Sequence, residues 1–187
     1  HTVRMAIRGT PVADWTGRFD DLAAREAHLG AAELDELGQA AWFTGRDDVS
    51  RRAWERAHLR HLDDGDLGAA VRCVFWLGFT LSEHGEEVLA RTWMGRLFEL
   101  CARPDADQRT DAFRGLCSAV ARFAQGDLAA SVPLYRSAAE LAVAVDDGDL
   151  DALATMGLGR ALVHLGRVEE GFGKLDQVML MIGSGRV

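Results

Sequence analysis

Proline, β-branched residues and long apolar runs are scarce in this sequence, and each scarcity excludes a class of structure. Only three prolines occur among 187 residues, and few prolines with few β-branched residues favour helix over sheet. The densest apolar run, residues 73–81, falls well short of the roughly 18 apolar residues that span a bilayer. We therefore expect an all-α, soluble protein located in the cytoplasm.

Cysteine is also rare, with Cys73, Cys101 and Cys117 as the complete set. Three thiols cannot all pair with one another, and none has the close spacing of a redox or zinc motif. Each lies in an apolar stripe of helical period. These positions indicate buried, reduced thiols in a cytoplasmic protein.

Basic residues are fewer than acidic ones: the chain has 21 lysines and arginines against 29 aspartates and glutamates, so its net charge is −8. Binding to a nucleic-acid backbone needs a cationic face. We therefore expect no direct nucleic-acid binding by this chain and no attachment to a membrane.

Glycine is abundant, and four glycines recur at a nearly constant interval: Gly45, Gly85, Gly126 and Gly166. A period of about 40 residues is typical of helical-repeat proteins, in which each unit is one helical hairpin that stacks on its neighbours. Glycine tolerates the left-handed conformation that ends a helix, and an adjacent acidic residue can cap the next helix. These glycines therefore predict the turns within four hairpins.

Small and large residues recur at fixed distances from each of these turns. The small positions are Gly38, Gly78, Ala119 and Gly159 before the turn and Ser50, Ala90, Ser131 and Gly171 after it. The large side chains that follow are Trp54, Met94, Tyr135 and Leu175. Small residues let two helix backbones approach closely, and we expect the large side chains to fill the gap between successive hairpins.

Apolar residues at spacings of three and four define the helices between these turns. Polar connectors rich in aspartate, with glycine or proline, separate the hairpins at 63–66, 103–107 and 146–149. The predicted helices cover 11–27, 31–44, 47–63, 67–84, 86–102, 108–125, 128–146, 149–165 and 167–182. We predict one helical-repeat domain over residues 1–187, with four to five hairpins. His1 is not an initiating methionine and no signal-peptide pattern follows it, so we expect a fragment of a longer protein.

The pattern of small residue, turn, small residue and large residue resembles the tetratricopeptide repeat, lengthened by several residues at the connector between hairpins. Five stretches resemble the repeat region of bacterial LuxR-type transcriptional regulators more specifically. They are Ala40–Asp47, Ala53–His58 and Arg72–Gly78, together with Gly65–Asp66 and Leu165–Gly171. The resemblance covers roughly residues 30–182.

This resemblance implies a right-handed α-α superhelix and a regulatory role. In such regulators a helical-repeat region receives a protein or small-molecule signal or assembles subunits, and a separate helix-turn-helix domain binds DNA. No helix-turn-helix with a basic recognition helix occurs in this chain. We therefore expect a protein-interaction or signal-sensing module. A stand-alone adaptor or scaffold, and a small-molecule sensor with its ligand in a concave groove, stay open as alternatives.

Residues with catalytic or metal-binding chemistry are sparse. Ser131 and Ser137 have no base and orienting acid near them in sequence, and the periodic glycines do not form a phosphate loop. His58 and His61 share one helix face, with Asp63 or Asp64 beside them as a further metal ligand. The same residues also fit a charged helix end. We expect no enzymatic activity, no metal and no cofactor.

Tryptophan and arginine provide the candidate binding site. Trp42, Trp54 and Trp76 come from adjacent hairpins, with Arg46 and Arg72 near them in sequence. Aromatic and arginine side chains on the inner face of a repeat array suit a peptide or a small ligand. The alternative is core packing between repeats, which the position of Trp54 favours. The candidate site residues for a partner or ligand are Trp42, Arg46, Arg72 and Trp76.

The last predicted helix carries an apolar stripe where a terminal repeat normally has a polar outer face. The stripe comprises Val168, Phe172, Leu175, Val178, Met179 and Ile182, and Leu180 and Met181 add apolar surface on other sides. We expect a further hairpin, or a second copy of the chain, to cover this surface.

Overall fold

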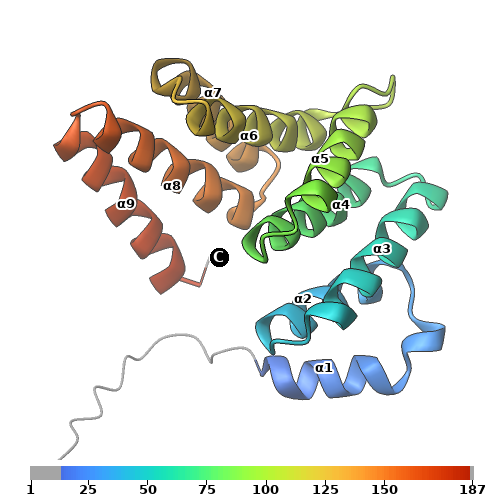
Figure 1. Ribbon diagram of the computed structural model, residues 1–187. Helices are drawn as coiled ribbons and strands as arrows, with labels where there is room; N and C mark the ends of the chain where they lie inside the picture. The colour runs from blue at the N-terminus through green and yellow to red at the C-terminus, as the bar shows by residue number, and fades with distance from the viewer. Residues whose placement is uncertain (1–13, 186–187) are drawn as a thin grey trace, which may run out of the picture. The chain divides into compact units, whose positions relative to one another are not determined.

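The computed structural model describes residues 14–185, and these residues are all-α. They form nine α-helices that pack as consecutive antiparallel hairpins (Figure 1). The helices are α1 (Trp15–Ala24), α2 (Ala31–Phe43), α3 (Asp47–Asp63), α4 (Leu67–Glu83), α5 (Glu87–Cys101), α6 (Gln108–Ala124), α7 (Leu128–Ala144), α8 (Gly148–His164) and α9 (Val168–Gly183), with a 3₁₀ turn η1 (Glu26–His28) after α1. The predicted all-helical class is confirmed, and the described part of the chain contains no strand.

The predicted helix limits agree closely with the structure from α2 onward. The first helix was expected over 11–27, but α1 covers Trp15–Ala24 and the separate turn η1 follows it. Residues 11–13 of that expected helix lie outside the described residues.

Glycines with positive φ close the hairpins, as their spacing predicted. The φ angles of the four periodic glycines are 71° at Gly45, 76° at Gly85, 79° at Gly126 and 80° at Gly166. In this conformation a residue with a Cβ is strained, whereas glycine is not. The Arg46 N–H then donates to the Ala41 carbonyl at 2.8 Å, which satisfies an otherwise free carbonyl at the end of α2.

Aspartates cap the N-termini of several helices, where their carboxylates accept hydrogen bonds from first-turn backbone N–H groups that have no partner within the helix. The Asp66 carboxylate accepts from the Ala69 N–H at 2.9 Å, and the Asp147 carboxylate accepts from the Leu150 N–H at 3.0 Å. A capping side chain of this kind contributes roughly 1 kcal/mol. The aspartate-rich connectors thus serve as helix starts.

The described chain comprises two compact units, residues 14–117 and residues 118–185, and the division falls inside α6. In the first unit, α1 packs on α2, α2 on α3, α3 on α4 and α4 on α5. The core of this unit includes Leu34, Leu37, Trp54, Ala57 and Leu77, all at most 1% exposed.

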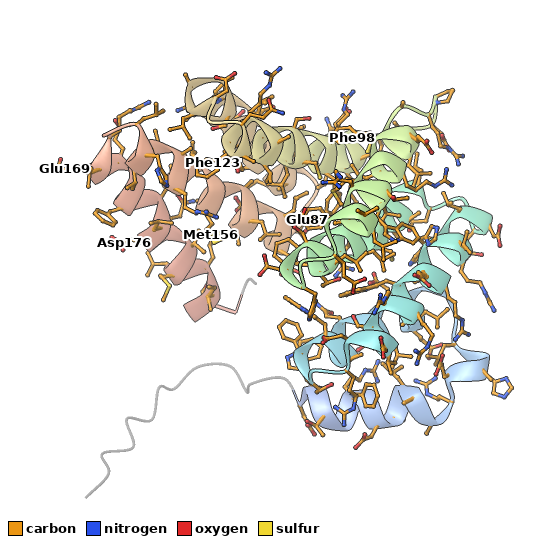
Figure 2. The ribbon with its side chains drawn as sticks, viewed as in Figure 1. Glu87, Phe98, Phe123, Met156, Glu169 and Asp176 are labelled. Carbon is orange, nitrogen blue, oxygen red and sulfur yellow. The ribbon has the colours of Figure 1, made fainter. Side chains whose placement is uncertain are left out.

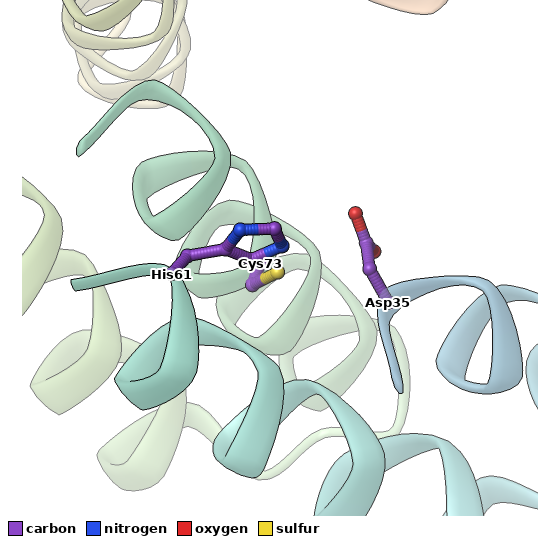
Figure 3. Close-up of side chains that lie close together, drawn as sticks. All are labelled: Asp35, His61 and Cys73. Carbon is purple, nitrogen blue, oxygen red and sulfur yellow. The ribbon is translucent and has the colours of Figure 1, made fainter. Parts of the chain in front are cut away.

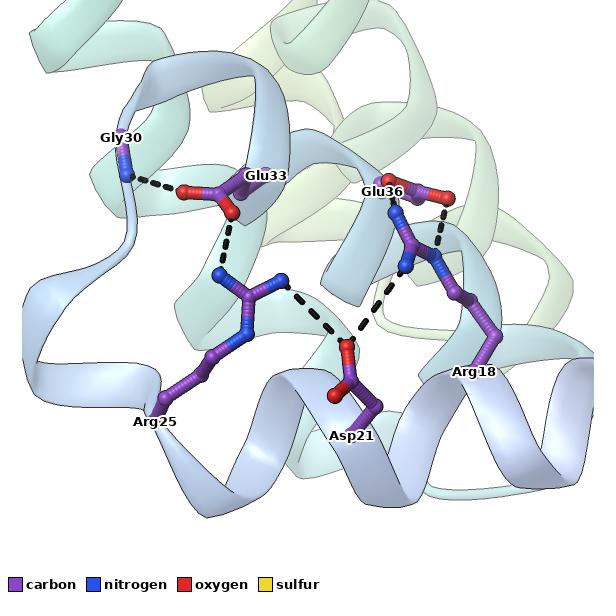
Figure 4. Close-up of polar contacts among 6 residues, drawn as sticks. All are labelled: Arg18, Asp21, Arg25, Gly30, Glu33 and Glu36. Carbon is purple, nitrogen blue, oxygen red and sulfur yellow. Dashed lines mark hydrogen bonds and ion pairs between the residues drawn. The ribbon is translucent and has the colours of Figure 1, made fainter.

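An ion-pair network also joins α1 to α2 in the first unit (Figure 4). Arg18 contacts the Glu36 carboxylate through two nitrogens, and Arg25 contacts Glu33. Asp21 lies between the two arginines and pairs with both, at 3.6 Å and 3.3 Å. The network is exposed, so it orients the first helix more than it stabilises it.

The second unit packs α7 on α8 and α8 on α9. The backbones of α8 and α9 approach each other closely, since a Cβ on Gly171 would come within 2.8 Å of the Gly159 carbonyl oxygen. This contact has the close backbone approach that the paired small residues predicted. Glycine is required there because two of the three nearest atoms belong to the backbone, which cannot move aside.

In three of the four hairpins the large residue after the turn lies over a glycine of its own hairpin, as Leu175 of α9 does over Gly159 of α8. Trp54 of α3 lies over Gly38 of α2, and Met94 of α5 lies over Gly78 of α4, each within one hairpin. Two of these residues also reach the next hairpin, as predicted: Trp54 stacks on Trp76 of α4, and the Met94 sulfur lies 3.9 Å from the Cys117 sulfur of α6. Tyr135 behaves as expected, because it reaches Gly157 on α8, which belongs to the next hairpin. The missing side chain of each glycine provides the space that the large side chain fills.

The apolar stripe of α9 is also distributed differently. Val178 was expected on the open stripe, but it is buried together with Met181 and Ala152 of α8. The exposed apolar residues of α9 are Val168, Phe172, Met179, Leu180 and Ile182. The helix therefore has one apolar face packed on α8 and a second that is open among the described residues.

The three cysteines are buried free thiols, as predicted. Burial raises the pKa of Cys101 to about 11, so this thiol stays protonated at neutral pH. None of the described helices is both long and apolar enough to cross a bilayer.

Candidate functional site

Two of the candidate residues, Trp42 of α2 and Trp76 of α4, lie side by side. Their ring centroids are 5.7 Å apart, and Phe79 lies one helical turn beyond Trp76 with a centroid distance of 5.6 Å. All three side chains are half-buried. The stacking of α2, α3 and α4 thus brings together aromatic residues that are more than 30 positions apart in sequence.

This aromatic group continues toward α1. The Phe43 ring lies 5.0 Å from Trp42 and 4.7 Å from Trp15, and Phe43 is 52% exposed. We refer to the continuous row as the aromatic strip; it comprises Trp15, Trp42, Phe43, Trp76 and Phe79. Partly exposed aromatic side chains that adjoin one another are typical of recognition surfaces.

The third tryptophan of the sequence pattern belongs to the core. Trp54 is 1% exposed and stacks beneath Trp76 at 6.3 Å. Its indole N–H donates to the Asp35 carboxylate at 2.9 Å. The interpretation of Trp54 as a core residue is therefore confirmed. Trp54 packs against the buried side of Trp76, which belongs to the strip.

Arg72 lies one turn before Trp76 on α4, but it is engaged by a carboxylate. Its guanidinium donates to Asp35 at 2.8 Å, and the Arg72 side chain is 29% exposed. Asp35 therefore holds two donors, the Trp54 indole and the Arg72 guanidinium. Arg72 therefore links α4 to α2 through Asp35, and we interpret it as a residue that positions these two helices.

Arg46 lies in the turn between α2 and α3. Its guanidinium carbon lies 4.1 Å above the centre of the Phe19 ring, a cation–π contact. Within residues 14–185 no carboxylate pairs with it. Arg46 is thus a cation available to an anionic group of a ligand.

Trp42 and Arg46 also line a cavity of about 410 Å³ between the turns α2–α3 and α4–α5. The other lining residues are Gly45, Asp47, Asp48, Val49, Ser50, Arg51, Thr80, Leu81, His84 and Glu86. Arg51 pairs there with Asp48 at 3.0 Å and with Glu86 at 3.5 Å. The Ser50 hydroxyl is buried and has no hydrogen-bond partner. The cavity is therefore lined mainly by polar and charged side chains, with Trp42 as its large aromatic residue.

His84 provides the titratable group of this cavity. Its Nδ1 lies 2.7 Å from the Thr80 carbonyl and its Nε2 lies 3.2 Å from the Asp47 carboxylate. Both neighbours accept hydrogen bonds, so they favour the doubly protonated ring. The Thr80 carbonyl first, and then Asp47, raise the pKa of His84 above its ordinary value.

This raised pKa leads to an expected pH dependence. Because the folded state binds the His84 proton more tightly than the unfolded chain does, the stabilisation is fully present below the ordinary histidine pKa of about 6.5. It is lost as the pH rises through the folded pKa. An NMR titration of the imidazole should show a raised pKa, and Asp47→Asn should lower it. An imidazole that titrates at or below its ordinary pKa would contradict this contact geometry.

The histidine and aspartate group that the sequence offered as a metal alternative is not brought together. Asp63 and Asp64 are exposed at the end of α3, whereas His58 is buried with its ring 5.3 Å from Trp93. Burial lowers the pKa of His58, which keeps this ring neutral at physiological pH. His61 is also buried, but its neighbours come from two other helices.

His61 lies beside Asp35 of α2 and Cys73 of α4 (Figure 3). One donor atom of each side chain lies within 4.8 Å of the others, and all three residues are buried. No spacing in the sequence indicates this group, because its members come from three different helices. The sequence signal for this group is weak: Asp35 and His61 are polar residues at buried positions, and Cys73 lies in an apolar stripe.

Comparison with known proteins does not identify a family for this chain. No model of a known protein family matches the chain. No curated protein matches it either. The helical hairpins and the aromatic strip are therefore the observations from which a function is inferred.

Proposed function

We propose that this chain is a protein-interaction or signal-sensing helical-repeat module of a bacterial transcriptional regulator of the LuxR type, acting in the cytoplasm. The aromatic strip is the observation that carries this proposal. It runs over α2 and α4, which are the first helices of successive hairpins, and helical-repeat proteins bind partners along extended concave surfaces. The tetratricopeptide-like pattern and the right-handed superhelix that it implies belong to the same proposal.

The proposed partner is a peptide segment with apolar side chains and an acidic group. Half-buried tryptophans supply large apolar contact area at small entropic cost, and they are enriched at binding hot spots. Arg46 lines the same cavity as Trp42 and stacks on the Phe19 ring, and it supplies a cation for a carboxylate of the partner. The net charge of −8 argues against nucleic acid as the direct partner of this segment.

Peptide selection from a displayed library tests this function. Selected peptides should bind the wild-type chain, and Trp42→Ala or Trp76→Ala should weaken binding by about 30-fold or more, as for a hot-spot residue. Phe98 provides the matched control, because it is an aromatic residue on α5, 40% exposed and outside the strip (Figure 2). Phe98→Ala should leave affinity within about twofold. Equal affinities for wild type and the two tryptophan variants would contradict the proposal.

A small-molecule sensor is the second candidate, favoured by the cavity of about 410 Å³ beside Trp42. Ligand sites in proteins commonly have volumes of about 300–1,000 Å³. Thermal shift against a metabolite panel distinguishes this function from peptide binding. Stabilisation that depends on Arg46 would favour a small-molecule sensor, and the absence of any stabilising compound would count against it. A stand-alone adaptor would use the same peptide surface without a DNA-binding domain in the same protein.

We also propose that the open apolar face of α9 is covered, by a further hairpin or by a second copy of the chain. Phe172 and Met179 are 56% and 66% exposed, one below the other on this helix. Charged neighbours such as Glu169 and Asp176 flank the face (Figure 2). Sedimentation velocity should show association at increasing concentration, and Phe172→Asp should abolish it. A monomer at every concentration would exclude the second copy.

A further inference from the structure

We propose that Asp35, His61 and Cys73 form a binding site for one divalent transition-metal ion, with Zn²⁺ as the best match. The three side chains come from α2, α3 and α4 and converge in the interior of the first unit (Figure 3). Their exposed fractions are 7%, 7% and 0%. Carboxylate oxygen, imidazole nitrogen and thiolate sulfur are the three donor types that zinc takes in proteins.

The His61 ring provides an independent observation that points to a ligand. Its Nε2 atom is buried and has no hydrogen-bond partner. Buried polar side-chain atoms are paired in the large majority of cases, so an orphaned imidazole nitrogen needs an explanation. A metal ion bound to this nitrogen would supply the missing partner.

The surroundings of Asp35 suit a ligating carboxylate. The Trp54 indole N–H donates to one carboxylate oxygen at 2.9 Å, and Arg72 donates to the other at 2.8 Å. Each oxygen retains a lone pair for a metal, and such outer contacts orient ligating side chains. Arg72 and Trp54 are therefore positioning residues for this site.

Charge can also be balanced at the site. Burial and the adjacent Asp35 carboxylate raise the pKa of the Cys73 thiol, so without metal it stays protonated. On binding, the S–H bond breaks, the sulfur–metal bond forms, and one proton leaves to solvent. The thiolate and the Asp35 carboxylate then offset the two charges of the metal, and the positive charge of Arg72 lies on a side chain that is partly exposed.

A thiol, an imidazole and a carboxylate are also the groups of a catalytic triad with a cysteine nucleophile. The burial of these three residues favours metal binding over catalysis. Cys73 is fully buried, so no substrate reaches its sulfur. A protonated thiol is also a poor nucleophile. A metal ion needs far less access than a substrate, and it would link three helices beneath the aromatic strip.

Titration with Co²⁺ tests this site, because cobalt bound by thiolate gives a charge-transfer absorption in the near ultraviolet. The chelator-treated full chain should bind one equivalent with this absorption, release about one proton per metal at neutral pH, and unfold at a higher temperature. Zn²⁺ should displace the cobalt. Cys73→Ser should abolish the absorption, and His61→Gln should weaken binding by more than the roughly 10–100-fold expected for an outer-shell change.

Two other buried thiols provide matched controls. Cys101→Ser and Cys117→Ser should leave the cobalt absorption unchanged, since neither belongs to the group. Far-ultraviolet circular dichroism without metal establishes that each variant is folded. Absence of the absorption in the folded wild-type chain, or its persistence in Cys73→Ser, would overturn the proposal.

Discussion

Trp54→Ala is expected to lower the free energy of unfolding of residues 14–117 by about 3–5 kcal/mol, the range for removing a large buried aromatic side chain. Trp54 is 1% exposed, fills the space over Gly38 and donates its indole N–H to Asp35. The truncation leaves a cavity and removes one of the donors of a buried carboxylate. Urea unfolding followed by far-ultraviolet circular dichroism measures the effect.

Leu59 is the matched control for this substitution, because it lies on the same helix, α3, and is 54% exposed. Leu59→Ala should change the free energy of unfolding by no more than about 0.5 kcal/mol. Trp54→Phe should fall between the two, since it keeps most of the volume and loses the hydrogen bond. Similar losses for Trp54→Ala and Leu59→Ala would show that Trp54 is not the centre of this core.

Gly171→Ala is expected to destabilise residues 118–185 by about 2 kcal/mol, although alanine is the better helix former. The added Cβ would meet the Val163 side chain at 2.5 Å, the Gly159 carbonyl oxygen at 2.8 Å and the Val163 backbone nitrogen at 3.0 Å. Two of these neighbours are backbone atoms, so relief requires α8 and α9 to separate. Overpacking of this kind typically costs about 1–3 kcal/mol.

Gly173 provides the control two residues further along α9. A Cβ on Gly173 meets nothing within 4 Å, so Gly173→Ala should stabilise the protein by up to about 1 kcal/mol through helix propensity alone. The two substitutions are chemically identical and should have opposite signs. Stabilisation by both would mean that the close approach of α8 and α9 does not exist.

The helices and their turns could be predicted from the sequence because their determinants are local. A glycine with positive φ, an aspartate that caps the next helix and an apolar period each act within a few residues. Gly126 illustrates this: its φ of 79° ends α6, and Asp127 directly after it accepts a hydrogen bond from the Ala130 N–H. The packing of Trp54 over Gly38 within one hairpin was missed, because it depends on how two helices cross.

The candidate site was predictable only in part for the same reason. Trp42 and Trp76 could be placed near each other from their positions in adjacent repeats, and the structure brings them together. The partner of Arg72 could not, since Asp35 lies 37 positions away. Of the two interpretations of His58, His61, Asp63 and Asp64, the metal alternative does not agree with the structure, because the two aspartates are exposed at the helix end whereas the histidines are buried.

If the aromatic strip is a recognition surface, a selected peptide should change the backbone amide chemical shifts of the helices that carry it. We expect the perturbed amides to fall on α2 and α4, centred on Trp42 and Trp76, with smaller changes near Arg46. Perturbations confined to α3 and α5, or a bound peptide that leaves α2 and α4 unchanged, would contradict it.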